Sequence, residues 1–160
     1  MIARVLAATV AGGITYFILG FLIFGLVLEE TVMKPNMNSY PGLMKEMPVW
    51  APLILANLVL AFLLAYIFDN WASIRTFGGG LKAGAIIAFL QALGFQLMFL
   101  AFMNLAKNYI PAVADVIAST VMGAITGGVI GLRLLILVLL SCEGLPGRGD
   151  VIEAGKDEQG

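Results

Sequence analysis

The sequence predicts an all-α, polytopic membrane protein in which four transmembrane helices form an antiparallel bundle. Of the 160 residues, 61% are hydrophobic and only 12% are charged, whereas about 25% of the residues of a soluble domain are charged. Four apolar stretches are long enough to cross a hydrocarbon core of about 30 Å. Trp50 and Trp71 stand at the two ends of the second stretch, about 31 Å apart along a helix, and indole rings prefer the two membrane surfaces.

The membrane domain is predicted to comprise residues 1–142. Its first apolar run, from Val5 to Leu28, exceeds the apolar region of a signal peptide, which is about 7–15 residues long, so we expect it to remain in the membrane. Glycine and charged residues dominate after the last span, which predicts a disordered polar tail over residues 143–160. The four predicted spans cover residues 5–28, 49–70, 82–106 and 112–135.

Two boundaries carry specific expectations. The run Gly78-Gly79-Gly80 before the third span lacks the spacing of a phosphate-binding loop, and we interpret it as a flexible turn. Arg133 interrupts the fourth span and is followed by the apolar run LLILVLLSC. A helix that continued to Cys142 would be about 48 Å long. Such a helix either tilts, with Arg133 at the membrane surface, or leaves the membrane with its last turns.

The basic residues predict the orientation. Six of them fall on the side of the termini and the middle loop and three on the other side, which favours cytoplasmic termini. Without the two in the distal tail, the bias falls to four against three. The first group is Arg4, Arg75, Lys82, Arg133, Arg148 and Lys156, and the second is Lys34, Lys45 and Lys107.

Composition argues against several kinds of chemistry. The chain has no histidine and a single cysteine, Cys142, so imidazole metal sites, Ser-His and Cys-His nucleophile pairs and an intramolecular disulfide cannot form. A net charge of −1 offers no basic face for nucleic acid. We therefore expect no enzymatic activity, no cofactor and no nucleic-acid partner, and we expect the lipid bilayer to be the main partner.

Small residues recur at four-residue spacing in the third and fourth spans. In lipid, helices associate through close backbone approach, which small residues at i and i+4 allow. We predict that the two spans pack against each other, while the alternative is an interface with a second copy or another membrane protein. The predicted packing residues are Gly80, Gly84, Gly123, Gly127 and Gly131.

A few polar residues lie inside the predicted spans. Asn57, Gln96 and Thr120 fall about a third of the way in from the outer surface, and Gln91 falls nearer the midplane. One interpretation is hydrogen bonding between helices, each bond contributing about 0.6 kcal/mol. The alternative is a polar pathway through the bundle.

Charged residues near the boundaries suggest two further roles. Asp69 at a helix C-terminus and Arg133 among apolar residues are each unfavourable alone, so we predict an ion pair between them, with Arg75 and Lys82 as competing partners. Asp115 is predicted to lie in the first turn of the fourth helix, where the helix dipole stabilises a negative charge.

The outer loop contains four methionines. Thioethers are soft ligands that suit Cu(I), so a soft-metal site is one interpretation of this loop. Packing of these side chains at the membrane surface is the favoured interpretation. The methionines are Met33, Met37, Met44 and Met47.

The stretches YIFDNWASIRTFGGGLKAGAIIAFLQALGF and DVIASTVMGAITGGVIGL resemble a group of small, uncharacterised bacterial membrane proteins with four helices. The resemblance covers roughly residues 5–132. It implies location in the bacterial inner membrane, but it implies no activity.

The sequence thus predicts a multi-pass inner-membrane protein that serves as a structural or assembly module. The alternative is a small transporter or channel whose pathway is lined by the intramembrane polar residues. A cavity that reaches those residues favours transport, whereas a tightly packed interior favours the structural role.

Overall fold

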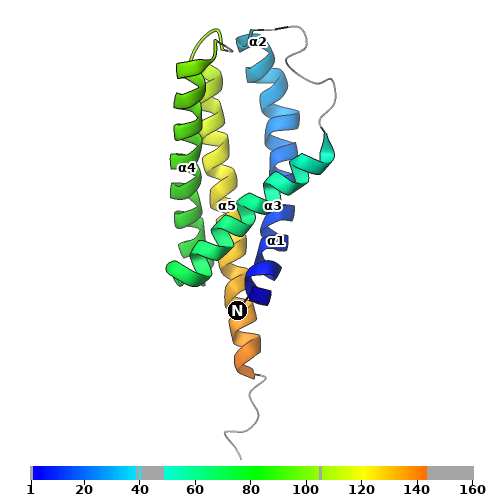
Figure 1. The fold of residues 1–160 in the computed structure, drawn as a ribbon, viewed down its shortest axis with the longest axis vertical. Coiled ribbons are helices and arrows are strands. Elements are labelled where there is room, and N and C mark those ends of the chain that lie inside the picture. Colours follow the sequence, from blue (N-terminus) through cyan, green and yellow to red (C-terminus); the bar gives the residue numbers. More distant parts are fainter. Residues whose placement is uncertain (1, 39, 41–48, 105, 144–160) are drawn as a thin grey trace, which may run out of the picture.

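The protein is all-α, as predicted, and its helices form a four-helix bundle (Figure 1). The computed structural model describes residues 2–38, 40, 49–104 and 106–143, and within these ranges only an isolated bridge between Met37 and Ala106 has β-type pairing. The elements are α1 (Ile2–Gly20), the π-type helix η1 (Phe21–Met33), α2 (Lys34–Asn36), α3 (Trp50–Tyr66), the π-type turn η2 (Ile67–Trp71), α4 (Phe77–Phe102) and α5 (Ile110–Glu143).

Within the described residues, four helical segments are long and apolar enough to cross a membrane, as in a multi-pass membrane protein. They are Ile2–Asn36, Trp50–Trp71, Phe77–Phe102 and Ile110–Leu140.

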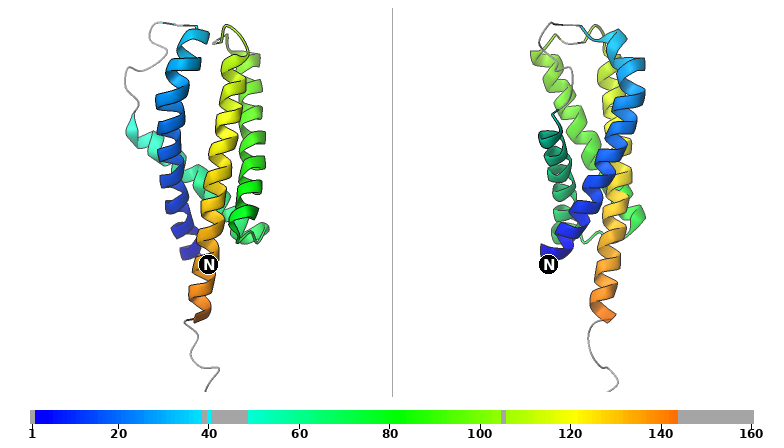
Figure 2. Two further views of the ribbon diagram at one scale, coloured as in Figure 1. Left: turned by 180° about the vertical axis from the view of Figure 1, so that it is seen from behind. Right: turned by 90° about the vertical axis from the view of Figure 1, so that its right-hand side faces the viewer.

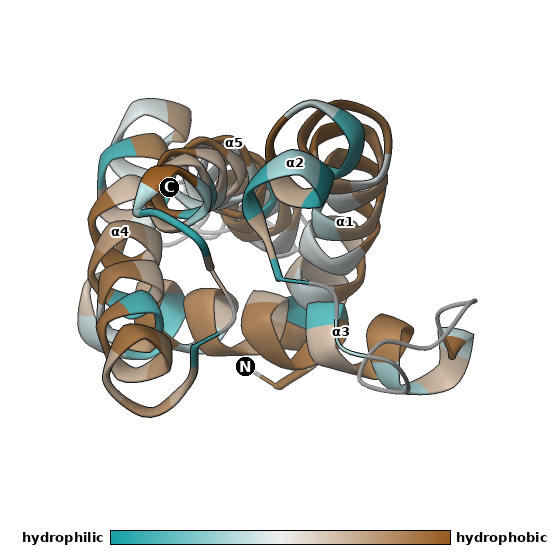
Figure 3. Cartoon of the chain, turned by 90° about the horizontal axis from the view of Figure 1, so that it is seen from above, coloured by the Kyte–Doolittle hydropathy of each residue, from teal (hydrophilic) through white to brown (hydrophobic). Residues whose placement is uncertain are grey.

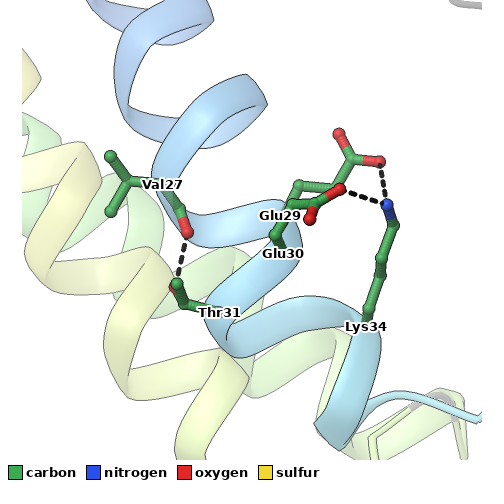
Figure 4. Close-up of polar contacts among 5 residues, drawn as sticks. All are labelled: Val27, Glu29, Glu30, Thr31 and Lys34. Atoms are coloured by element: carbon green, nitrogen blue, oxygen red, sulfur yellow. Dashed lines mark hydrogen bonds and ion pairs between the residues drawn. The ribbon is translucent and has the colours of Figure 1, made fainter.

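The first helix extends beyond its predicted end. It continues without a break from α1 through η1 and α2 to Asn36. Lys34 lies 2.8 Å from Glu30 and 3.7 Å from Glu29, and Thr31 donates a hydrogen bond to the carbonyl of Val27 (Figure 4). Pairing at i and i+4 stabilises a helix, so the two glutamates that limit the apolar run do not end the helix.

The third and fourth helices also differ from the predicted boundaries. Helix α4 begins at Phe77, so the glycine run predicted to be a flexible turn is helical, and the Thr76 hydroxyl caps it by accepting a hydrogen bond from the Gly79 N–H at 3.1 Å. Helix α5 continues through Arg133 to Glu143. The tail predicted to be disordered, apart from Glu143, lies outside the described residues.

The helices are arranged as two pairs, α1 with α3 and α4 with α5, joined where α1 packs on α5 (Figures 1 and 2). Ile2 and the last turn of α5 lie at one end of the bundle, here called the terminal end. At the other end, α2 meets the connection between α4 and α5. Viewed from that end, polar residues gather at α2 and this connection, while much of the helical surface is hydrophobic (Figure 3).

Helix α3 crosses the bundle obliquely (Figure 1). The ring of Trp50, its first residue, lies 6.2 Å from that of Phe17, which is near the middle of the helix Ile2–Asn36. Trp50 therefore lies level with the middle of the first helix and not at its far end, where the tryptophan pair predicts it. As a result, α3 covers the terminal half of the bundle and barely contacts α4.

The hydrophobic core lies where α1, α3 and α5 meet. Phe68, Ile130 and Leu134 are fully buried there. A side chain at Gly12 would lie only 2.6 Å from Ile130 Cδ1, so this glycine allows α1 to approach α5 closely. The terminal half is thus packed tightly around this core.

Candidate functional site

Helices α4 and α5 are held together by the predicted glycine contacts. The buried residues of α4 are Gly80, Gly84, Ala88 and Ala92, all on one face. A Cβ at Gly80 would overlap the carbonyl of Gly127, and one at Gly84 would overlap that of Gly123. Gly131 continues the same seam, because a Cβ there would lie 2.5 Å from the Thr76 carbonyl oxygen.

This seam fixes which residues of α4 and α5 face each other. Each step of four residues along α4 is matched by four residues back along α5. A Cβ at Gly123 would also overlap the Ala88 side chain, and the same spacing continued along both helices leads from Ala88 and Ala92 toward Ser119 and Asp115. The glycine seam therefore leads directly to a polar group on α5.

A groove with a volume of about 680 Å³ lies beside this part of the contact between α4 and α5. All four main helices contribute to it, and its α3 wall includes Leu55 and Val59, which are more than half exposed. The groove therefore opens sideways, on the surface that faces lipid. Its polar lining residues are Tyr16, Asn57, Gln91, Asp115 and Ser119, and its apolar and aromatic ones include Phe24, Leu60, Phe95 and Met122.

Asp115 and Gln96 form the one polar contact between helices at the groove that the described residues show. The Gln96 amide donates a hydrogen bond to Asp115 Oδ2 at 2.7 Å. Because α5 begins at Ile110, Asp115 lies in the second turn and not in the first turn as predicted. Its partner is consequently a side chain of α4 and not the free N–H groups at the helix end.

The predicted intramembrane cluster is only partly assembled. Asn57 and Gln91 both line the groove, and Gln96 joins them through Asp115. Thr120 is not among the lining residues, and its hydroxyl donates a hydrogen bond to the Val116 carbonyl of its own helix at 2.6 Å. Asn57 likewise donates to the Leu53 carbonyl at 2.8 Å.

Three polar lining residues were not singled out from the sequence as part of a site. Tyr16, Ser119 and Asp115 come from two helices that the sequence alone does not place side by side. The register set by the glycines provides the missing signal for Ser119 and Asp115. No comparable pattern identifies Tyr16, whose hydroxyl lies near Gly123.

The predicted ion pair between Asp69 and Arg133 is wrong. Asp69, with a side chain 2% exposed, lies 3.7 Å from Arg75, which is 38% exposed. Ser73 adopts φ of 49°, and the Ile74 N–H donates to the Phe68 carbonyl at 2.9 Å, so the chain folds back and brings Arg75 onto η2. Arg133 is exposed, because its neighbour Leu134 occupies the inward-facing position on α5.

The end of the bundle opposite the terminal end is closed by a polar clasp. Asn36 accepts two bonds at 2.9 Å, from the Lys107 N–H and from the Asn108 amide. The Asn104 carbonyl accepts bonds from Asn38 at 3.1 Å and from Tyr40 at 3.0 Å. The clasp comprises Asn36, Asn38, Tyr40, Asn104, Lys107 and Asn108, and it joins the first helix to the α4–α5 connection.

The methionine hypothesis stays a prediction. The Met37 N–H donates a hydrogen bond to the Met33 carbonyl at 2.9 Å, whereas Met44 and Met47 lie outside the described residues. Within the described ranges, no group of three or more His, Cys, Asp or Glu residues is placed to hold a metal ion.

Comparison with known proteins identifies no relative: no family model, curated protein or solved structure matches the chain.

Proposed function

We propose that this membrane protein binds a small amphipathic molecule in the groove, as a small transporter does. The observation that carries the proposal is a set of unpartnered polar groups. In the part of the chain that the structure describes, the Gln91 amide and the hydroxyls of Tyr16 and Ser119 line the groove without making a side-chain hydrogen bond.

The energetics of the membrane explain why this observation points to a ligand. An unsatisfied polar group costs several kcal/mol in hydrocarbon, where no water is available as a partner. A purely structural bundle would pair such groups between helices or replace them with apolar side chains. The groove therefore accommodates water or the polar atoms of a bound molecule.

The distribution of packing supports binding over a structural or assembly role. The glycine seam and the core of the terminal half are closely packed, whereas the groove is open. The groove volume of about 680 Å³ falls within the range of small-molecule sites, roughly 300–1,000 Å³. Open space next to polar groups is what the transporter alternative predicts.

We also propose that the terminal end faces the cytoplasm of a bacterial cell and that the groove lies toward the outer side. Arg4, Arg75 and Lys82 belong to the terminal end, whereas Lys34 and Lys107 lie at or beside the clasp. An excess of basic residues on the cytoplasmic side supports this orientation. The inner membrane is the location implied by the resemblance of residues of about 5–132.

Thiol labelling tests whether the groove is accessible to water. Cys142, the one cysteine in the chain, is replaced by serine, and Ser119→Cys is introduced. N-ethylmaleimide, which crosses the membrane, reacts with thiolates, and thiolates form in water and not in hydrocarbon. We expect Ser119→Cys to react in intact membranes.

Ile117→Cys is the matched control, because Ile117 lies close by on α5 and is 60% exposed on the outer surface of the bundle. It should remain unreactive, since lipid covers that face. Equal reactivity at both positions, or none at position 119, would show that the groove is not a wet site and would overturn the proposal.

A further inference from the structure

We infer that the ligand of the groove is an organic cation with an apolar body, and that Asp115 is its counter-ion. This inference rests on the proposed binding function and assigns the chemical class of the ligand. Asp115 is the acidic residue among those that line the groove.

The carboxylate of Asp115 has capacity for a further partner. Gln96 binds Oδ2 at 2.7 Å, and within the described residues no hydrogen bond or ion pair reaches Oδ1. An ionised carboxylate accepts up to four hydrogen bonds. An ammonium group would fill the remaining positions with charge-assisted bonds, which are stronger than the bond from a neutral amide.

The basic residues that the structure describes are engaged or distant. Lys34 pairs with Glu29 and Glu30, and Arg75 pairs with Asp69. The Lys107 ammonium donates to the Pro35 carbonyl at 3.3 Å in the connection at the end of the bundle. Among the described residues, none provides a positive charge for Asp115, so the complementary cation has to come with the ligand.

The walls of the groove suit the rest of such a molecule. Tyr16, Phe24 and Phe95 present aromatic rings from two different sides, and Leu60 and Met122 add apolar surface. Aromatic faces attract cations through their quadrupoles, most strongly when water is excluded. A groove lined by one carboxylate and several aromatic residues favours a cation over an anion or a neutral sugar.

Two sources provide this chemistry. One is a free lipophilic amine dissolved in the membrane, and the other is a phospholipid whose headgroup carries an ammonium. Both carry an ammonium group on a molecule with an apolar body, and the sideways opening of the groove admits both.

Binding of tetraphenylphosphonium to the purified full-length protein tests the inference. We expect saturable binding in equilibrium dialysis, and we expect Asp115→Asn to weaken it roughly 30-fold, because an unpaired partner of a desolvated charge pair is costly. Asp115→Glu should keep most of the affinity. Tetraphenylborate, which has the same shape and the opposite charge, should not bind saturably.

Two further variants keep the inference testable if Asp115→Asn does not fold. Phe95→Leu, at a half-exposed position on the rim, should weaken binding a few-fold by removing an aromatic face. Glu30→Gln removes a carboxylate outside the groove and should leave binding unchanged. Equal affinity for the two tetraphenyl ions would overturn the inference, as would full affinity in either groove variant.

Lipid competition distinguishes the two sources. If phosphatidylethanolamine displaces the probe and phosphatidylglycerol does not, the cation is a lipid headgroup. If neither lipid displaces the probe, it is a free amine. Failure of the cation to bind while Ser119→Cys still reacts with the thiol reagent would refute the charge assignment and leave the proposed binding function standing.

Discussion

Gly84 and Gly94 lie on the same helix in opposite environments. A Cβ at Gly84 would overlap the carbonyl of Gly123 and lie 3.0 Å from the Gly127 Cα, whereas nothing lies within 4 Å of a Cβ at Gly94. The first glycine is needed for close approach of two backbones, while the second only weakens the helix. Substitutions at these two glycines therefore distinguish the effect of helix packing from the effect of helix propensity.

We expect Gly84→Ala to destabilise the protein by about 2 kcal/mol, because backbone atoms cannot move aside as a flexible side chain would. Gly94→Ala should be neutral or stabilising by up to about 1 kcal/mol. Thermal unfolding in a mild detergent, compared between the two variants, measures the difference. A similar loss in both would mean that the seam does not depend on this contact.

At this scale the sequence predicted the backbone contacts better than the charges. The i, i+4 glycines need only the helical period to share a face, so their contact follows from spacing. The ion pair of Asp69 depends on Ser73, whose positive φ turns the chain back toward η2. No residue type at that position signals the turn, because serine rarely adopts this conformation, and the prediction therefore selected Arg133 in place of Arg75.

At the scale of elements, helix α3 is the main departure from the predicted bundle. Its sequence is apolar on every side, so no periodic pattern indicates which face packs or how strongly the helix tilts. The number of spans and their approximate limits follow from hydropathy and length alone. Tilt depends on contacts with neighbouring helices, and α3 contacts α1 far more than α4.

The oblique course of α3 predicts that Trp50 lies deep in the bilayer. The helix Ile2–Asn36 has 35 residues and is about 52 Å long, and Trp50 packs near its middle against Phe17. With Trp71→Phe, Trp50 is the one tryptophan left. Its fluorescence should be quenched more by lipids brominated at acyl positions 11 and 12 than by those brominated at 6 and 7.

Trp50→Phe provides the reverse case, because Trp71 is 75% exposed near the terminal end and should be quenched more by the shallow bromines. Stronger shallow quenching of Trp50 would instead place it at the membrane surface, as its spacing from Trp71 suggests.

For the whole molecule, the orientation in the membrane makes the sharpest prediction. With the terminal end in the cytoplasm, alkaline phosphatase fused after Gly160 should be inactive, and the same reporter fused after Tyr40 should be active. A green fluorescent reporter should give the opposite pattern at the two positions. An active phosphatase after Gly160 would reverse the orientation and place the groove toward the cytoplasm.

For the proposed ligand, the sideways opening of the groove determines whether its concentration in the lipid or in the water controls binding. A molecule that reaches Asp115 past Leu55 and Val59 arrives from the hydrocarbon phase and not from bulk solution. Occupancy then depends on the number of ligand molecules per lipid, and an affinity measured against the aqueous concentration rises with the partition coefficient of each compound. Within a series of related amines, chain length should therefore shift the apparent affinity even where the contacts inside the groove stay the same.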